Sequence, residues 1–256
     1  MNAVIGDLIA EAVGKPALAA SASPRDVPIG MARDACRFGP EAIGPMKGVA
    51  KQLCERDLLA TAAVVYAAAA RLIAADPDPE KGGGERASAE LTETAQVMVD
   101  SNHLELGILL AEEALRPELN PKNRRSRNLL GQWLVRSAQR DGDIGKYKRA
   151  ADLLVDVMEY DDRARLFHGL AALAVADLEG DRTARSSALD HIDKAMRRWA
   201  FGNRNPADRR RWVGQLRRLG KFGADDLQRS LLEFANENSS WPAIRAAELV
   251  DEAPNR

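Results

Sequence analysis

Two pairs of aspartates have a spacing that acid–base or metal chemistry could use. Asp161 and Asp162 are adjacent, and Asp190 and Asp193 lie three residues apart, close to one helical turn. Paired carboxylates can bind a divalent cation or act as an acid and a base. However, the first pair falls between two helical patterns, where aspartates cap helices, and the second lies beside a lysine and an arginine on one helix face. We therefore predict structural roles for both pairs.

The other reactive side chains do not combine into a catalytic or metal-binding motif. Cys36 and Cys54 fit neither a disulfide framework nor a metal knuckle, and the three histidines are far apart in the sequence. The glycines at 82–84 follow an acidic, proline-containing stretch rather than a strand, so they lack the context of a phosphate-binding loop. The sequence therefore predicts a protein that is not an enzyme and that uses no cofactor or metal.

Arginines beside aromatic residues are the strongest functional signal. Arg198 precedes Trp199, and Arg211 precedes Trp212. An arginine fork next to an aromatic ring can bind phosphate or carboxylate and stack on a base. Residues 122–221 contain 23 Lys and Arg against 13 Asp and Glu, although the net charge of the chain is −1. The basic edge that we consider for binding consists of Arg124, Arg125, Arg127, Arg209, Arg210 and Arg211. The alternative is that these arginines only solvate amphipathic helices.

Helical hairpins are the elements that must position these residues. Between residues 123 and 162, apolar residues recur with helical spacing from Leu129, stop at residues 141–143, and resume from Tyr147 to Met158. This pattern predicts two helices joined by one tight turn.

Composition supports an all-α fold. Of the 256 residues, 45% are hydrophobic and only 5% are aromatic, and strand patterns are nearly absent. We predict a short helix and a proline-broken, partly disordered segment at residues 1–40, a helical-repeat domain at 41–252, and a tail at 253–256. We expect a mobile loop at 76–86 and a capping helix after Pro242 that closes the domain.

Small and large residues recur along the chain in a fixed order. A small residue in a first helix is followed, twelve residues later, by a triplet, small–large–small in most units, with spacings of four and three. The first-helix positions are Ala50, Ala95, Ala138, Ala176 and, as an exception, Leu216. The triplets are Ala62, Tyr66, Ala69; Gly107, Ala111, Ala114; Ala150, Leu154, Val157; Ala188, Ile192, Ala195; and the weaker Gln228, Leu232, Ala235. Small side chains on facing helices permit close helix axes, and each hairpin leaves an apolar edge for its neighbour to cover.

This arrangement resembles the tetratricopeptide repeat family. The resemblance covers about residues 46–235, and the segments LCERDLLATAAVVYAAAA and MVDSNHLELGILLAEEAL match the family's turn and second helix. Successive units are 45, 43, 38 and 40 residues apart, against about 34 in the family, so the longer-period armadillo or HEAT class is the alternative. The resemblance implies an all-α, right-handed superhelical stack of four to five helical hairpins.

The resemblance also implies where a partner would bind. First helices of such a stack line a concave groove, and carrying the groove positions over gives Lys47, Lys51, Gln96, Val135, Gln139 and Leu173. We therefore expect a protein-interaction scaffold or adaptor that binds a peptide or helix of a partner protein, and the basic excess favours an acidic partner. The alternative is a regulatory or nucleic-acid-associated factor that uses the basic half, residues 122–221.

The sequence further predicts a cytoplasmic protein without a membrane partner. Asp7 and Glu11 interrupt the N-terminal apolar stretch, which also lacks the cationic region of a secretory leader. No apolar run reaches transmembrane length without polar interruptions, and two isolated cysteines fit a reducing compartment.

Overall fold

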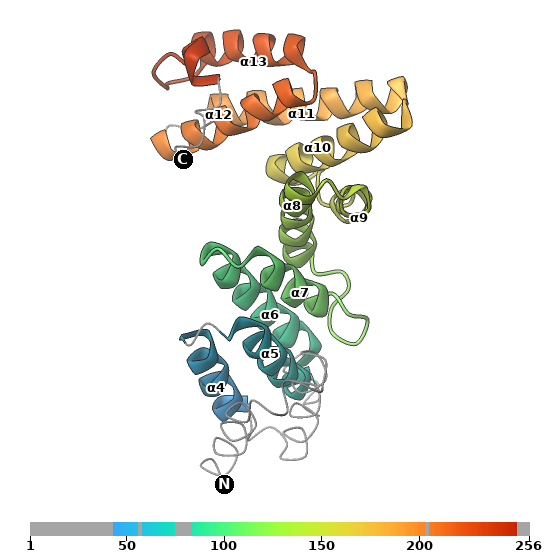
Figure 1. Cartoon of the computed structure of the whole chain (residues 1–256), viewed down its shortest axis with the longest axis vertical. Helices are drawn as coiled ribbons and strands as arrows, with labels where there is room; N and C mark the ends of the chain where they lie inside the picture. The colour runs from blue at the N-terminus through green and yellow to red at the C-terminus, as the bar shows by residue number, and fades with distance from the viewer. Residues whose placement is uncertain (1–42, 56–57, 75–82, 203–204, 250–256) are drawn as a thin grey trace. The chain divides into compact units, whose positions relative to one another are not determined.

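The structure is a computed structural model that describes residues 43–55, 58–74, 83–202 and 205–249. Within these residues all regular secondary structure is helical and no β-strand occurs, which confirms the predicted all-α class (Figure 1). The chain divides into two compact units, and the boundary lies inside a helix, after Trp133. The predictions for residues 1–40 and 253–256 lie outside the described residues. None of the helices described combines bilayer-spanning length with an apolar composition.

The first unit contains two helical hairpins and the start of a further helix. Its helices are α4 (Ile43–Glu55), α5 (Leu59–Ala74), α6 (Gly83–Asp100), α7 (Leu104–Ala114) and the first part of α8 (Arg124–Asp141). α4 packs on α5, α5 packs on α6 and α7, and α6 packs on α7. Alanines and a few large side chains such as Met46 and Leu72 fill the contact between α4 and α5. The alanine-rich faces let the paired helices pack closely.

Buried polar side chains join α6 to the start of α8. The Ser88 hydroxyl donates to the Ala114 carbonyl at 2.8 Å, and Asn123 Nδ2 donates to Ser88 Oγ at 2.9 Å. Thr92 Oγ1 donates to the Ser88 carbonyl at 2.7 Å and is also hydrogen-bonded to Ser126 Oγ. Asn123 Oδ1 accepts from the Ser126 N–H at 3.1 Å, so Asn123 caps α8. We call Ser88, Thr92, Asn123 and Ser126 the hydroxyl network.

The second unit contains the end of α8 and the helices that follow it. These are α9 (Ile144–Leu154), α10 (Asp162–Glu179), α11 (Arg182–Gly202), α12 (Pro206–Lys221), α13 (Asp225–Asn238) and the 3-10 helix η3 (Ala246–Leu249). α10 packs on α9 and α11, α11 and α12 both pack on α13, and α12 also contacts η3 (Figure 1). Trp212 lies fully buried among these helices, and its Nε1 donates to the Met196 carbonyl at 2.9 Å.

The hairpins turn in a common way. In four of those described, the residue before the second helix donates its N–H to the carbonyl five residues earlier. These bonds run from Leu58 to Leu53 (2.9 Å), from His103 to Met98 (2.8 Å), from Asp181 to Ala176 (3.0 Å) and from Ala224 to Leu219 (3.0 Å). Asn102 and Gly180 precede two of these donors with φ of 69° and 70°. Glycine adopts this left-handed conformation without strain and asparagine tolerates it, so the first helix ends and the second begins within a few residues.

The recurring small residues lie at close helix contacts, as predicted. At most 2% of the residue surface is exposed at Ala50, Ala62, Ala95, Ala111, Ala138, Ala150, Ala176 and Ala188. A Cβ on Gly107 of α7 would lie 2.9 Å from the Ala95 carbonyl oxygen of α6 and would also overlap Val99. A Cβ on Gly169 of α10 would lie 3.0 Å from the Ala188 carbonyl oxygen of α11. Both hairpins therefore bring one helix against the backbone of the other.

The distance from the turns to the small residues is not constant. The second helices begin at Leu59, Leu104, Ile144, Arg182 and Asp225, which are 45, 40, 38 and 43 residues apart rather than the predicted 45, 43, 38 and 40. The difference arises because Ala150 and Ala188 lie one helical turn further from their turns than Ala62 and Gly107 do. Positions three or four residues apart share one helix face, so the two registers look equivalent in the sequence.

Two helix boundaries differ from the prediction. α9 ends at Leu154, and the last two residues of its predicted stripe lie in the turn that follows. α6 begins at Gly83, inside the predicted loop 76–86. A Cβ at Gly83 would lie 2.7 Å from the Ile73 carbonyl oxygen, so glycine allows α6 to start against the end of α5.

The chain after Pro242 also differs from the predicted capping helix. It is irregular up to Arg245 and then forms the 3-10 helix η3. The Asn236 side chain of α13 provides the hydrogen-bond partners that the Ile244 backbone would have in a helix. Its Nδ2 donates to the Ile244 carbonyl at 3.3 Å, and its Oδ1 accepts from the Ile244 N–H at 2.8 Å. Side-chain partners thus satisfy backbone groups that the prediction assigned to a helix.

We expect Gly107→Ala to destabilise the chain by about 1–3 kcal/mol, because the added methyl group would overlap the Ala95 carbonyl and the Val99 side chain. The matched control is Gly48→Ala in α4, where a Cβ would meet no atom within 4 Å. That change should stabilise the chain by about 0.5–1 kcal/mol. Urea unfolding followed by circular dichroism measures both values. Similar stabilities of the two variants would contradict the close contact of α6 and α7 at Gly107.

Candidate functional site

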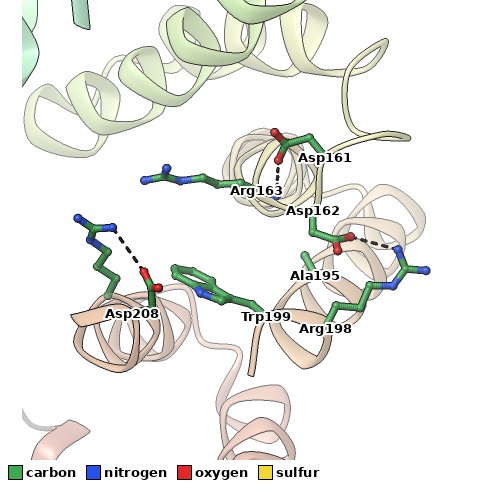
Figure 2. A pocket seen from close by; sticks show the side chains of 8 residues that line it. Asp161, Asp162, Arg163, Ala195, Arg198, Trp199 and Asp208 are labelled. Carbon is green, nitrogen blue, oxygen red and sulfur yellow. Dashed lines mark hydrogen bonds and ion pairs between the residues drawn. The ribbon is translucent and has the colours of Figure 1, made fainter. Parts of the chain in front are cut away.

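A pocket in the second unit gathers charged and aromatic side chains. It has a volume of about 330 Å³ and lies where the start of α10, the end of α11 and the start of α12 meet (Figure 2). Its lining residues are Asp161, Asp162, Arg163, Ala195, Arg198, Trp199, Asp208 and Arg211. We call it the α10–α12 pocket.

Helix caps place two sides of this pocket. Asp161 is the N-cap of α10, and its Oδ1 accepts from the Arg163 N–H at 2.7 Å and from the Ala164 N–H at 3.0 Å. Asn205 caps α12 in the same way and accepts from the Ala207 N–H at 2.9 Å. Each cap fixes the residue at which its helix begins, and with it the direction of the side chains in the first turn.

The contact between α10 and α11 places the third side. α11 returns antiparallel to α10, so the end of α11 lies beside the start of α10. Ala188, Ile192, Ala195 and Trp199 recur at spacings of four, three and four, so they share the face of α11 that contacts α10. Trp199 is half-buried, and Figure 2 shows its ring directed toward the start of α12. The indole gives the pocket an apolar wall that remains open to solvent.

The aspartates of the pocket are engaged by arginines. Asp162 Oδ1 accepts from Arg165 Nη1 at 2.5 Å and from Arg198 Nη1 at 3.2 Å. Arg211 Nη1 donates to Asp208 Oδ1 at 3.4 Å. The Arg198 and Arg211 side chains are 64% and 65% exposed, so solvent screens these two ion pairs. Each guanidinium has five N–H donors, and most of them remain available to a ligand.

Arg163 differs from the other arginines of the pocket. Its guanidinium makes no ion pair or hydrogen bond with any described residue. Figure 2 shows the side chain extending from α10 over the space that Trp199 borders. With Arg165 included, four arginines meet three aspartates here, so one positive charge is unmatched. An anionic group is the ligand that this arrangement favours.

The two aspartate pairs of the sequence make the structural contacts that we predicted. Asp161 caps α10, Asp190 forms an ion pair with Lys194 at 2.6 Å, and Asp193 forms one with Arg197 at 2.7 Å. In the part of the chain that the structure describes, no three His, Cys, Asp or Glu side chains are grouped as a metal site would require.

The predicted groove residues of the first unit are accessible, and two of them have partners. Lys47 of α4 forms an ion pair with Glu90 of α6, and Lys51 is exposed. Gln96 Nε2 donates to Asp100 Oδ1 at 2.8 Å within α6.

The predicted groove residues of the second unit are mostly buried. Val135 and Leu173 are both 0% exposed, so their side chains pack in the core and are closed to a partner. The apolar faces of α8 and α10 are wider than one stripe, and both residues belong to them. Gln139 is half-buried, and its Nε2 is buried without a hydrogen-bond partner among the described residues.

The predicted basic edge divides between the two units. Arg124, Arg125 and Arg127 lie in the first unit, and Arg209, Arg210 and Arg211 lie in the second. Arg125 Nη1 lies 3.4 Å from Glu93 Oε1. Arg210 is exposed, while Arg211 lines the α10–α12 pocket.

Arg209 corrects the prediction of a basic edge at the start of α12. Its Nη1 and Nη2 donate to the two Glu248 carboxylate oxygens at 2.8 and 2.9 Å, and its Nε donates to the Pro242 carbonyl at 3.1 Å. Arg217 Nε donates to the Glu248 backbone carbonyl at 2.5 Å. The hydrogen bonds from Arg209, and then that from the Arg245 N–H, lower the pKa of Glu248 to about 2. Since the Arg209 side chain is only 15% exposed, it holds the C-terminal segment rather than a partner.

Two histidines form a pair between α10 and α11. The rings of His168 and His191 have centroids 5.4 Å apart, and each Nδ1 is buried without a hydrogen-bond partner among the described residues. Burial lowers the pKa of both rings. The charge of His191 lowers the pKa of His168 further, while for His191 the nearby Asp190 opposes the shift and Arg165 and Lys194 add to it.

Sequence reasoning found part of the pocket and missed the rest. It singled out Arg198 beside Trp199, and Arg211 as part of the basic edge, but it gave no role to Arg163 or Asp208. The signal that could have found Arg163 is its position directly after a capping aspartate pair, on the helix whose hairpin partner ends in Trp199.

We expect Arg209→Gln to release the segment after Pro242 from α12, because it removes a bidentate contact to Glu248. Hydrogen–deuterium exchange at the Ile244 and Glu248 amides should become about tenfold faster or more. The matched control is Arg210→Gln, at an exposed neighbour whose side chain has no partner among the described residues. Equal exchange in the two variants would contradict the role of Arg209.

We expect the chain to lose stability as the pH falls below 6.5, the ordinary pKa of histidine. The unfolded chain takes up protons in this range that the half-buried rings of His168 and His191 resist, so acid favours unfolding. Thermal unfolding over a pH series should show a flatter dependence in the variant His168→Phe with His191→Phe. The control His103→Gln, at the α6–α7 turn, should keep the wild-type slope. An unchanged slope in the double variant would show that other groups cause the dependence.

Comparison of the chain with protein-family models, with curated proteins and with solved structures finds no match. The tetratricopeptide resemblance is therefore carried by the repeat pattern of this sequence alone. The description of the α10–α12 pocket likewise rests on the geometry of this chain and not on a related protein.

Proposed function

We propose that the chain is a protein-interaction scaffold that binds a peptide or helix of a partner protein at the α10–α12 pocket. The observation that carries this proposal is the combination of half-buried Trp199 with Arg163, whose guanidinium has no partner in the described residues. Tryptophan and arginine are the side chains that most often dominate binding at protein interfaces. The volume of about 330 Å³ is at the low end for a small-molecule site and suits a few side chains of a peptide.

A tetratricopeptide-like stack is the architecture that we propose behind this function. The shared turn geometry and the buried small residues support repeated hairpins. The pocket joins the starts of α10 and α12, which are the first helices of successive hairpins. Repeat proteins bind partners on surfaces to which equivalent elements of successive repeats contribute, and this pocket has that composition.

The pocket supports partner binding better than the predicted groove does. Val135 and Leu173 are closed to solvent, whereas Lys51, Gln96 and Gln139 keep at least part of their side chains accessible. We therefore assign the main contact to the pocket and leave the accessible groove residues a secondary role.

A regulatory or nucleic-acid-associated role is the alternative, and the basic excess in residues 122–221 favours it. However, Arg209 is bound to Glu248 and Arg125 to Glu93, so fewer arginines can contact phosphates. Affinity for nucleic acid depends on several simultaneous phosphate contacts. The test of the proposed function must therefore separate a protein from a nucleic acid as the bound species.

We expect a photo-crosslinking phenylalanine analogue at Phe201 to capture a protein from extracts of the native host. Phe201 is 74% exposed and lies two residues after Trp199, so the replacement is conservative and close to the pocket. The control carries the same analogue at Leu178, which is 67% exposed and lies about 24 Å along α10 from Asp162. The captured protein should bind the purified chain, and Trp199→Ala should weaken its affinity about tenfold or more.

Three results would count against this function. Capture of the same proteins from Phe201 and Leu178 would mean that the pocket has no part in binding. An unchanged affinity in Trp199→Ala would mean the same. Recovery of nucleic acid rather than protein, with binding lost steeply as salt rises, would favour the alternative.

A further inference from the structure

We propose that the α10–α12 pocket binds the carboxylate of an aspartate or glutamate in the partner peptide, with an apolar neighbour of that residue against Trp199. The inference rests on the proposed function and names the chemistry of the partner. Arg163 is the residue that pairs with the incoming carboxylate.

The first argument is the charge that the pocket leaves unmatched. Asp162 is shared by Arg165 and Arg198, and Asp208 is bound by Arg211. Asp161 accepts two backbone N–H groups at the start of α10. Each carboxylate of the pocket therefore accepts hydrogen bonds from N–H donors. The Arg163 guanidinium has no acceptor among the described residues.

The second argument is the direction of the helices. α10 and α12 both direct their N-terminal ends at the pocket, and α11 directs its C-terminal end there. Helix N-termini carry partial positive charge, which Asp161 and Asp208 offset in the first turn or at the cap. Two N-termini and one C-terminus meet at the pocket, so the helix ends together leave a partial positive charge that adds to the unmatched charge of Arg163.

The third argument is the shape of the donors. Guanidinium groups bind carboxylates through two parallel N–H donors, which a lysine cannot provide. Arg198 and Arg211 each use one Nη1 donor in their contacts with the pocket aspartates and are mostly exposed, so their remaining N–H groups are open to a ligand. Figure 2 shows the Trp199 ring and the Arg163 side chain extending in the same direction from their helices. The ring therefore provides an apolar contact for the residue of the peptide next to the carboxylate.

One unmatched charge also selects among anions. A carboxylate carries one negative charge, whereas a phosphorylated side chain carries roughly −1.5 to −2 at neutral pH. A nucleic acid would present a series of phosphates and would need a row of unpaired cations. The single partnerless arginine of the pocket matches a carboxylate best.

The test uses the full chain and an array of short synthetic peptides. Each peptide carries a central Glu flanked by Leu, Phe or Trp, and matched peptides carry Gln, Lys or phosphoserine at the centre. A fluorescent single-stranded oligonucleotide is the nucleic-acid probe. We expect the wild-type chain to select Glu peptides over Gln peptides by about tenfold or more, because a charge-assisted pair is lost in the latter.

Charge reversal at Arg163 provides the decisive variant. Arg163→Glu should lose the Glu peptides and gain the matching Lys peptides, and Arg163→Lys should keep only part of the affinity. The matched control is Arg182→Glu, because Arg182 occupies the first turn of α11 behind its own capping residue, Asp181. Arg182 is exposed, has no side-chain partner among the described residues and lies about 24 Å along α11 from Arg198. Glutamate is favourable in the first turn of a helix, so both variants should fold.

The outcomes separate this inference from the proposed function. Binding of Glu peptides that Arg163→Glu loses and Arg182→Glu retains supports it, and a switch to Lys peptides supports it further. Equal binding of Glu and Gln peptides, lost in Trp199→Ala, overturns the acidic preference and leaves the scaffold intact. Selection of phosphoserine over Glu also overturns it. Binding of the oligonucleotide alone overturns both proposals.

Discussion

The contact of one helix with the backbone of its hairpin partner is the constraint on which the rest of the structure depends. Gly169 lies so close to the Ala188 carbonyl of α11 that no side chain fits between them. This contact fixes which face of α11 meets α10, and Trp199 lies on that same face three turns later. The orientation of Trp199 in the α10–α12 pocket is therefore set by small residues that do not line the pocket.

Arginines of this chain have opposite roles that depend on burial and partners. Arg209 is 15% exposed and is held by a carboxylate and by backbone carbonyls, so it binds the segment after Pro242 to α12. Arg163 sits in the first turn of α10 and has no side-chain partner in the described residues. The two side chains are chemically the same, and the surrounding acceptors decide which one holds the fold and which one stays open to solvent.

Local patterns in the sequence predicted most of the helices, the Asp161 cap and the helix-face ion pairs of Asp190 and Asp193, because each depends on residues close together in the chain. Asp161 could be recognised as a cap, and the small residues could be placed on the inner faces of the helices. The register of Ala150 and Ala188 could not be predicted, since a shift of one turn preserves the face. The exposure of Arg163 and the burial of Arg209 depend on segments far away in sequence, so no local pattern distinguishes them.

The hydroxyl network fixes how far the start of α8 is shifted along α6, which apolar packing alone does not fix. Two helices that meet only through apolar side chains can slide past each other by a turn and recover much of their contact, because dispersion has little directional preference. Hydrogen bonds among Ser88, Thr92, Asn123 and Ser126 are directional, and a slide of one turn would leave buried hydroxyl groups without partners. In a chain built from repeated small residues, a few buried oxygens thus select one alignment of α6 and α8 from several that apolar packing alone would accept.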